Sequence, residues 1–346
     1  MVKRAASATG GAQWQAVFHC GVIDMNWTFR RVAWLGAFLL AWPGVAPAQE
    51  AVPRLIRIVV PFSPGASNDA IARSLAGPLA ARLGANVIVD NRPGASGVIG
   101  SDAVAKAARD GGTLLLTSST FLTAAATLAK PPYDVNTAFA PVATVGQNPS
   151  LLAVHAGTPI RNAAELFAAA RAKPDDIAYG TAGVGSIGHM VTERMNAAAR
   201  VQMRHVPYKG AANAAIDLAA GQIHVMVSSY STLAALLKTE RVRLIAVTSR
   251  QPHPAFPDVP TLGATLPGFS SETWVGVFAP AGTPPRFVER LNRDISEISA
   301  SPELRAILEP DGMLPLATAP AAFATRIRQE YDQWRQIATD LKIISE

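Results

Sequence analysis

Cysteine is nearly absent from this chain of 346 residues. The single cysteine, Cys20, lies in an N-terminal stretch that we expect to be removed from the mature protein. A mature chain without cysteine can form no disulfide, no thiolate nucleophile and no cysteine metal site. The histidines show no H-x-x-x-H spacing, so the sequence predicts no zinc or other metal site.

Long apolar runs are also scarce. The run at residues 32–42 is too short to span a bilayer as a helix. It follows Arg30 and Arg31 and precedes Ala46-Pro47-Ala48, a small-x-small site of the kind that signal peptidase cuts. This pattern predicts a signal peptide that ends at Ala48, and hence an exported, periplasmic protein.

Met25 is the better translation start, because secretory signals begin close to their basic region. A genuine long leader that includes residues 1–24 is the alternative.

Clusters of basic residues are also missing from the mature chain. Removal of residues 1–48 takes away four basic residues and one acidic residue, so the formal charge falls from +6 to +3. With no basic stripe in the remainder, we expect no nucleic-acid partner.

Residues 49–346 are long for a single core, so two lobes are expected. Short apolar segments alternate with amphipathic ones, which is typical of α/β proteins in which helices cover mostly parallel sheets. Strands are predicted at residues 55–60, 86–89, 113–117, 142–145, 177–179, 203–206, 224–227, 243–247 and 274–279.

Helices are predicted between and after these strands. Asn162 is expected to cap a helix at residues 163–172, Ser101 to stand at the start of another, and Thr283 to cap a helix that follows it. Phe323, Trp334 and their neighbours recur at helical spacing in a last helix at residues 321–338, where we expect them to pack against the core.

Two loops of small residues each follow an apolar strand and open a helix. The first clamp loop is PFSPGASND at residues 61–69, before a helix at 70–83. The second clamp loop is GTAGVGSIGH at residues 180–189, before a helix at 190–199. Helix starts have unpaired N–H groups and partial positive charge, so they bind anions well. Two such loops from two lobes are suited to close on one small carboxylate.

Polar side chains in these loops have competing roles. Ser67 and Asn68 are candidates to cap the first helix, and a structural role is favoured for Asp69 because a carboxylate facing the cleft would repel an anion. Ser186 is expected to cap the second helix and to be a possible ligand donor. For His189, support of the cap and contact with the cleft are equally balanced.

The second clamp loop also matches enzyme motifs in part. Residues 183–188 fit G-x-G-x-x-G, but the acid expected about twenty positions later is missing from residues 204–208, and an exported protein would not meet NAD. Ser186 stands in VGSIG, which misses the G-x-S-x-G nucleophile elbow by one residue. The sequence therefore predicts no catalytic residue, no enzymatic activity and no cofactor.

Several ordered blocks along the chain form a more specific pattern. They are IVVPFSPG at residues 58–65, VDNRPGASG at 89–97, AYGTAG at 178–183, HVPYKG at 205–210, LIAVTS at 244–249, PDVPT at 257–261 and FAPAGTP at 278–284. With these blocks the chain, from residue 54 to residue 344, resembles the substrate-binding proteins of the tripartite tricarboxylate transporter system, the Bug-type periplasmic receptors.

The resemblance implies a Venus-flytrap fold of two α/β lobes that close on a ligand by hinge motion. One lobe would comprise residues 50–155 plus 273–346, and the other residues 156–272. It further implies a monomer that holds a small carboxylate largely through backbone amides, hydroxyls and waters, and that delivers it to membrane transporter subunits. A partner sensor kinase is an alternative reading, and an exported hydrolase on the same scaffold is a further, less favoured one.

The resemblance also implies which residues contact the ligand. They belong to the two clamp loops and to a distal wall of the pocket. These residues are Phe62, Ser63, Gly65, Ala66, Ser67, Asn68, Thr181, Ala182, Gly183, Gly185, Ser186, His189, Ser228 and Ser229.

Two departures from the family pattern concern the pocket. Ala66 replaces a usual glycine, so the first clamp loop is expected to be slightly more restricted. Ser228 and Ser229 replace a frequent Asp-Asn pair, so a neutral, hydroxyl-lined distal wall is expected, which weakens the case for an amino-acid ligand. The sequence leaves open whether the ligand is a mono-, di- or tricarboxylate, an aromatic acid or an amide.

Overall fold

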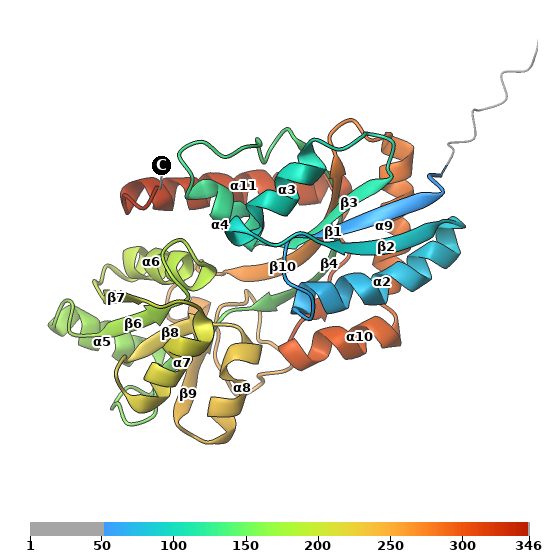
Figure 1. Cartoon of the computed structure of the whole chain (residues 1–346). Coiled ribbons are helices and arrows are strands. Elements are labelled where there is room, and N and C mark those ends of the chain that lie inside the picture. Colours follow the sequence, from blue (N-terminus) through green and yellow to red (C-terminus); the bar gives the residue numbers. More distant parts are fainter. Residues whose placement is uncertain (1–51, 345–346) are drawn as a thin grey trace, which may run out of the picture. The chain divides into compact units, whose positions relative to one another are not determined.

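A computed structural model describes residues 52–344 of the chain (Figure 1). The predicted signal peptide at residues 1–48, with Met25, Ala48 and Cys20, lies outside the described residues. Within the described range, no helix is both long enough and apolar enough to cross a membrane.

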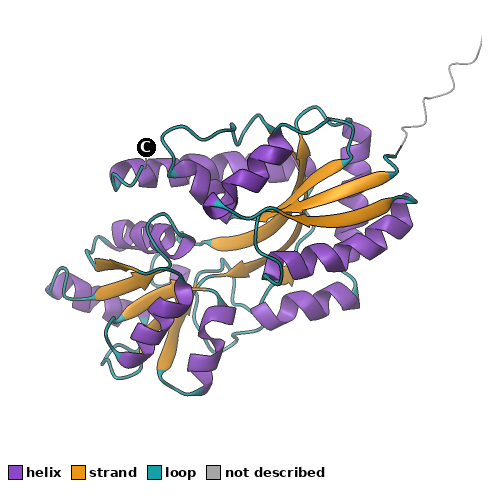
Figure 2. Cartoon of the chain, viewed as in Figure 1, coloured by secondary structure: helices purple, strands orange, loops and turns teal. Residues whose placement is uncertain are grey.

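Two β-sheets with helices packed against them make up this part of the chain (Figure 2). The six-stranded sheet has the order β11-β4-β10-β3-β1-β2, and the five-stranded sheet has the order β7-β6-β8-β5-β9. The strands are β1 (Leu55–Val60), β2 (Asn86–Asn91), β3 (Thr113–Ser118), β4 (Phe139–Pro149), β5 (Leu151–His155), β6 (Ala178–Thr181), β7 (Arg204–Pro207), β8 (Val225–Ser228), β9 (Val242–Val247), β10 (Glu272–Pro280) and β11 (Leu314–Pro315).

Both sheets are mixed, whereas mostly parallel sheets were expected. Strands β1, β2 and β3 are parallel, but β10 lies antiparallel between β3 and β4. Likewise β6, β7 and β8 are parallel, but β5 lies antiparallel between β8 and β9. The reason is topological: β5 follows β4 of the other sheet after one residue, and β10 follows β9 of the other sheet after residues 248–271. Each therefore enters its sheet from the side of the other one and runs against the strands whose carboxyl ends face that side.

Each predicted strand overlaps an observed one, but β5 and β11 were not predicted. Only Ser150 separates β5 from β4, so the sequence offers no turn to mark a new strand. Strand β5 pairs within the five-stranded sheet, although the predicted division assigned it to the first lobe. The pairing therefore places the change of sheet at Ser150 instead of residue 155; the division into lobes otherwise stays a prediction.

Helices follow most of the strands. They are α2 (Ser67–Leu83), α3 (Val98–Ala105), α4 (Thr120–Ala126), α5 (Ala163–Ala172), α6 (Ile187–Ala199), α7 (Ala211–Ala220), α8 (Tyr230–Lys238), α9 (Pro285–Ser299), α10 (Pro302–Leu308) and α11 (Pro320–Asp340), with short 3₁₀ turns η1 (Ala95–Gly97), η2 (Leu262–Ala264) and η3 (Glu309–Asp311).

The predicted helix caps were partly right. Asn162 caps α5, where its side chain accepts a hydrogen bond of 2.9 Å from the Glu165 N–H. Thr283 does not cap α9, because its hydroxyl donates to the Pro280 carbonyl and Pro284 holds the cap position. Ser101 lies inside α3 and not at its start.

Alternation along β1 distributes its side chains over two cores. Ile58 and Val60 pack with α2, α9 and α10 on one face of the six-stranded sheet, whereas Val59 packs on the other face with α4 and α11. On α11, Phe323 and Trp334 are buried, as their spacing predicted. This second core continues into α5 and α6 of the five-stranded sheet, so the two sheets share apolar packing.

A buried group of hydrogen bonds lies where the chain crosses between the sheets. The Ser150 N–H donates to the Thr248 hydroxyl over 2.9 Å, and the Thr248 N–H donates to the Ser150 carbonyl over 3.0 Å. Thr248 also accepts a 2.8 Å bond at its carbonyl from the Ser271 N–H. These bonds tie the crossing from β4 to β5 to the segment that returns into β10.

Candidate ligand-binding site

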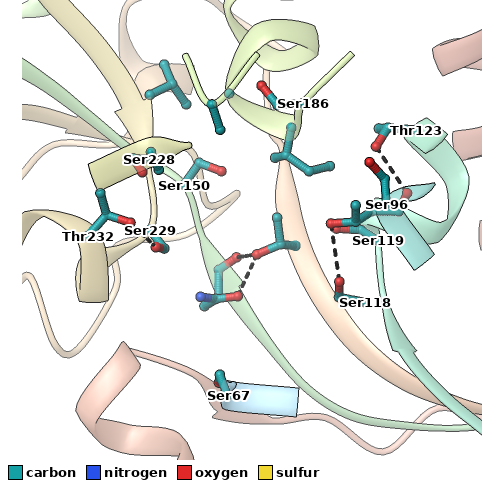
Figure 3. Close-up of a pocket in the computed structure, with 18 of the residues that line it drawn as sticks. Ser67, Ser96, Ser118, Ser119, Thr123, Ser150, Ser186, Ser228, Ser229 and Thr232 are labelled. Atoms are coloured by element: carbon teal, nitrogen blue, oxygen red, sulfur yellow. Dashed lines mark hydrogen bonds between the residues drawn. The ribbon is translucent and has the colours of Figure 1, made fainter. Parts of the chain in front are cut away.

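A cavity of about 500 Å³ lies where the carboxyl ends of parallel strands from both sheets meet (Figure 3). Helices α2, α6 and α8 begin beside it, directly after β1, β6 and β8. Ligands of open α/β sheets bind outside the carboxyl ends of the strands, and this volume suits a small molecule. The position and the size therefore mark this cavity as the candidate ligand site.

Hydroxyl groups dominate the lining of the cavity. Among the described residues that line it, only Asp311 has a side chain that is charged at neutral pH. No lysine or arginine is included, so backbone N–H groups would have to supply the positive potential for an anion. The lining hydroxyls belong to Ser67, Ser96, Ser118, Ser119, Thr120, Thr123, Thr127, Ser150, Ser186, Ser228, Ser229, Thr232 and Thr273.

The first clamp loop presents the start of α2 to the cavity. Ser67 and Asn68 are the first two residues of this helix and both line the cavity. Their N–H groups have no acceptor within the helix, because first-turn amides lack a preceding turn. The side chains of Ser67 and Asn68 make no cap bond, contrary to the prediction. Ala66 holds the cap position with an ordinary φ of −69°, so alanine causes no strain there.

Asp69 stabilises the first clamp loop from behind. Its carboxylate accepts hydrogen bonds from Arg73 Nε at 3.0 Å, from the Gly65 N–H at 2.9 Å and from Asn91 Nδ2 at 3.0 Å. These bonds, that from Arg73 foremost, lower the pKa of Asp69 to about 2 against the opposing effect of burial. Asp69 does not line the cavity, so it has the structural role that the sequence favoured.

The second clamp loop presents the start of α6. Ser186 caps this helix, as predicted: its hydroxyl accepts from the His189 N–H at 3.4 Å and donates to the Gly183 carbonyl at 2.7 Å. Ser186 also lines the cavity, together with Ile187 and Gly188, the first two residues of α6. Ser186 and Ser67 approach the cavity from opposite sides, so two helix starts face the same space (Figure 3).

His189 supports the cap and does not contact the cavity. Its Nδ1 accepts a 3.1 Å hydrogen bond from the Gly185 N–H, and its ring stacks on His205 with 4.0 Å between the centroids. The side chain is buried and absent from the cavity lining. Burial, with a smaller contribution from His205, lowers the pKa of His189 to about 4, so the ring is neutral at neutral pH.

The structure brings together half of the residues that the sequence assigned to the site. Ser67, Asn68, Ala182, Gly185, Ser186, Ser228 and Ser229 line the cavity. Several of the others have internal partners: the Gly65 N–H is bound to Asp69, and Thr181 Oγ1 lies 2.7 Å from His205 Nε2. The residues outside the lining are Phe62, Ser63, Gly65, Ala66, Thr181, Gly183 and His189.

Eleven further polar residues of the lining were not predicted, and Asn148, Ser119 and Asp311 stand out among them. Asn148 accepts a 2.5 Å bond from the Thr273 hydroxyl at its Oδ1, which leaves its Nδ2 as a donor beside the cavity. The Ser119 hydroxyl is buried and has no hydrogen-bond partner among the described residues. Ser119 lies two residues after the predicted strand at residues 113–117, which was a usable signal. Asn148 and Asp311 carry no local signal.

Asp311 contradicts the expectation of a neutral distal wall. It lines the cavity near Ser228, Ser229 and Thr232, and its Oδ1 accepts a 2.9 Å hydrogen bond from the N–H of Ser231 in α8. The acid comes from η3, far away in sequence, and therefore could not be found by reading the residues that follow β8.

Two mixed α/β sheets, crossing strands between them and a cavity at their carboxyl ends define the class of two-lobed periplasmic binding proteins. Within this class, the profile of the tripartite tricarboxylate transporter family receptor matches residues 71–343. The chain belongs to this family of solute-binding receptors.

Curated relatives agree with the family assignment. A UPF0065 protein from the tcbD-tcbE intergenic region of Pseudomonas sp. (strain P51) is 38% identical over 297 residues, which cover 85% of this chain and 88% of that protein. Protein BugT of Bordetella pertussis is 33% identical over 321 residues, which cover 91% of this chain and 98% of BugT.

Solved structures share the fold over most of the chain. R. palustris Rpa4515 with adipate has a TM-score of 0.69 at 31% identity and covers 86% of this chain and 97% of its own. The periplasmic binding protein BugD has a TM-score of 0.68 at 31% identity, with 85% and 99% covered. MatC from Rhodopseudomonas palustris with bound malate has a TM-score of 0.67 at 30% identity, with 82% and 99% covered.

Proposed function

We propose that this protein is a periplasmic receptor that binds a small organic carboxylate between its lobes and delivers it to membrane subunits of a tripartite tricarboxylate-type transporter. The observation that carries the proposal is the approach of two helix starts, α2 and α6, to one hydroxyl-lined cavity without any lysine or arginine in its lining. First-turn amides supply the positive potential that a carboxylate needs. Relatives solved with adipate and malate support the same ligand chemistry.

The proposed carboxylate site consists of Ser67 and Asn68 on one side and Ser186, Ile187 and Gly188 on the other. Ser119 and the Asn148 amide supply further donors from the first sheet and the crossing strand. The two lobes close around this site by a hinge motion at the crossing between the sheets, where Ser150 and Thr248 are hydrogen-bonded. The protein acts as a monomer.

A thermal-shift panel tests the proposal. The protein would be expressed as residues 49–346 and melted with carboxylates and with their uncharged amides or esters. A ligand that binds only the native state adds about 2.7 kcal/mol of stability at a hundredfold excess over its dissociation constant. A shift with an acid and none with its neutral analogue is expected. No shift across the panel, after removal of any co-purified ligand, would refute carboxylate binding.

The location is tested by export of the full chain. Expression in a Gram-negative host is expected to yield a periplasmic protein whose N-terminal residue is Gln49, because the small-x-small site ends at Ala48. A protein that stays in the cytoplasmic fraction with its leader intact would contradict the periplasmic assignment.

A further inference from the structure

Asp311 places a negative charge in the cavity lining beside α8. It is the single acidic or basic side chain that the described residues contribute to the lining. It belongs to η3, which comes shortly before β11 of the six-stranded sheet. Its carboxylate reaches the first turn of α8, where Oδ1 accepts from the Ser231 N–H at 2.9 Å. The carboxylate that binds the start of α8 therefore comes from a segment next to the six-stranded sheet, although α8 itself follows β8 of the five-stranded sheet.

The backbone around Asp311 holds it in this place. Gly312 has a φ of 66°, and a Cβ added there would lie 3.1 Å from the ring of Phe256, so the turn lies tightly against the segment after β9. Met313, the following residue, is buried and also lines the cavity. The turn that carries Asp311 is therefore held by packing of the two residues that follow it, and Asp311 itself is half-buried.

The three helix starts beside the cavity consequently differ in charge. At α2 and α6 the first-turn amides face the cavity without an acid from their own loops in the lining, whereas at α8 the helix start is already bound by Asp311. The hydroxyls of Ser228, Ser229 and Thr232 lie together beside the start of α8 (Figure 3). A carboxylate is attracted to the starts of α2 and α6 and repelled from Asp311 at the start of α8.

We propose that Asp311 restricts the ligand to monocarboxylates whose far end carries a hydrogen-bond donor, such as a hydroxyl or an ammonium group. The proposal rests on the proposed carboxylate-binding function and narrows its ligand class. A second carboxylate at the far end would meet a like charge and would compete with Asp311 for the Ser231 N–H. The preference differs from the dicarboxylates adipate and malate, which are bound in two similar structures.

Matched ligand pairs and one isosteric substitution test this inference. The protein would be purified from the periplasm after expression of the full chain. Affinities would be measured by calorimetry for three pairs: adipate and 6-hydroxyhexanoate, succinate and 4-hydroxybutyrate, terephthalate and 4-(hydroxymethyl)benzoate. Asp311→Asn removes the charge but keeps an oxygen that can accept from the Ser231 N–H. Glu309→Gln removes one charge from the same turn at an exposed residue outside the lining and is the matched control.

We expect the native protein to bind the hydroxy acid of at least one pair more tightly than the diacid. Asp311→Asn should raise the affinity for that diacid about tenfold and change the affinity for the hydroxy acid by less than about threefold. Glu309→Gln should leave both affinities unchanged.

If a hydroxy acid binds and its preference over the paired diacid is the same in Asp311→Asn as in the native protein, the role of Asp311 is overturned and the proposed function stays intact. Tighter binding of the diacid by the native protein would have the same consequence. Absence of binding for all six acids in native protein and variant would overturn the proposed function, and this inference with it.

Discussion

The two clamp loops have the same hydrogen-bond design but differ in charge. In both, the third residue of the helix turns back and accepts a hydrogen bond from a glycine N–H of the loop: Asp69 from Gly65 at 2.9 Å, and His189 from Gly185 at 3.1 Å. The acceptor is an ionised carboxylate in the first loop, whereas in the second it is an imidazole whose pKa is lowered to about 4.

This difference decides which helix start is better for an anion. Asp69 places a negative charge beside the start of α2, although Arg73 pairs with it at 3.0 Å. Neutral His189 leaves the positive potential at the start of α6 undiminished. We therefore expect the ligand carboxylate to depend more on the second clamp loop than on the first, and the following predictions test this asymmetry.

The largest effect is expected from a charge at the cap of α6. Ser186→Asp keeps a good cap residue but places a carboxylate at the proposed anion site, so the affinity for the acid identified in the thermal panel should fall at least a hundredfold by calorimetry. The matched change Ser67→Asp at the start of α2 should lower it only about tenfold. Unchanged affinity in Ser186→Asp would remove the second loop from the site.

The stability of the two loops should respond to acid in separate pH ranges. Unfolded histidine binds a proton near pH 6.5, whereas folded His189 stays neutral down to about pH 4, so the unfolded state binds more protons in between. The free energy of unfolding should therefore fall by about 2 kcal/mol from pH 6.5 to 4, with His205, whose pKa burial also lowers, adding to the loss.

Asp69 contributes in the same sense but at lower pH, because its unfolded carboxylate also binds a proton more readily than the folded one. Its folded pKa of about 2 lies below the ordinary 3.8, so its contribution to stability is present above pH 3.8 and is lost as the pH falls towards 2. Denaturant titrations of the native protein and of His189→Asn at a series of pH values would separate the two. An equally steep fall from pH 6.5 to 4 in His189→Asn would mean that other groups cause it.

In the second clamp loop, replacement of the neutral acceptor His189 with a carboxylate like that of Asp69 should weaken binding of the ligand carboxylate. His189→Asp keeps an acceptor for the Gly185 N–H but brings a negative charge behind the anion site, so we expect about tenfold lower affinity at pH 8, where His205 is neutral. His189→Asn, which keeps an uncharged acceptor, is the control and should bind like the native protein. Equal affinities of the two variants would show that the charge at this position is unimportant.

The smallest effect should come from the loop glycines. Gly65 and Gly185 have similar φ values, 81° and 77°, so alanine should cost each loop about 1 kcal/mol of stability. A Cβ at Gly185 would lie 2.9 Å from Thr127 Cγ2, however, whereas nothing lies within 4 Å of one at Gly65. Only Gly185→Ala should therefore lower ligand affinity, about threefold in calorimetry. An equal loss in Gly65→Ala would show that crowding against Thr127 is not the cause of the loss.

Local patterns were sufficient for most of the fold. Short apolar segments predicted nine of the strands in place, and the small-residue loops before α2 and α6 predicted the two helix starts that face the cavity. The caps Asn162 and Ser186 were recognised because a cap bond joins residues three apart, within reach of a local pattern.

Such local patterns could not predict which segments, distant in sequence, lie against each other. The sequence by itself determined the α/β class, the family and the two clamp loops, because these depend on periodicity and on short motifs. Only the tertiary structure decided that β5 joins the five-stranded sheet, that His189 turns away from the cavity onto His205, and that Asp311 lines the cavity beside α8. Each of these depends on contacts between segments distant in sequence, and packing and backbone pairing, not local preference, determine which segments meet.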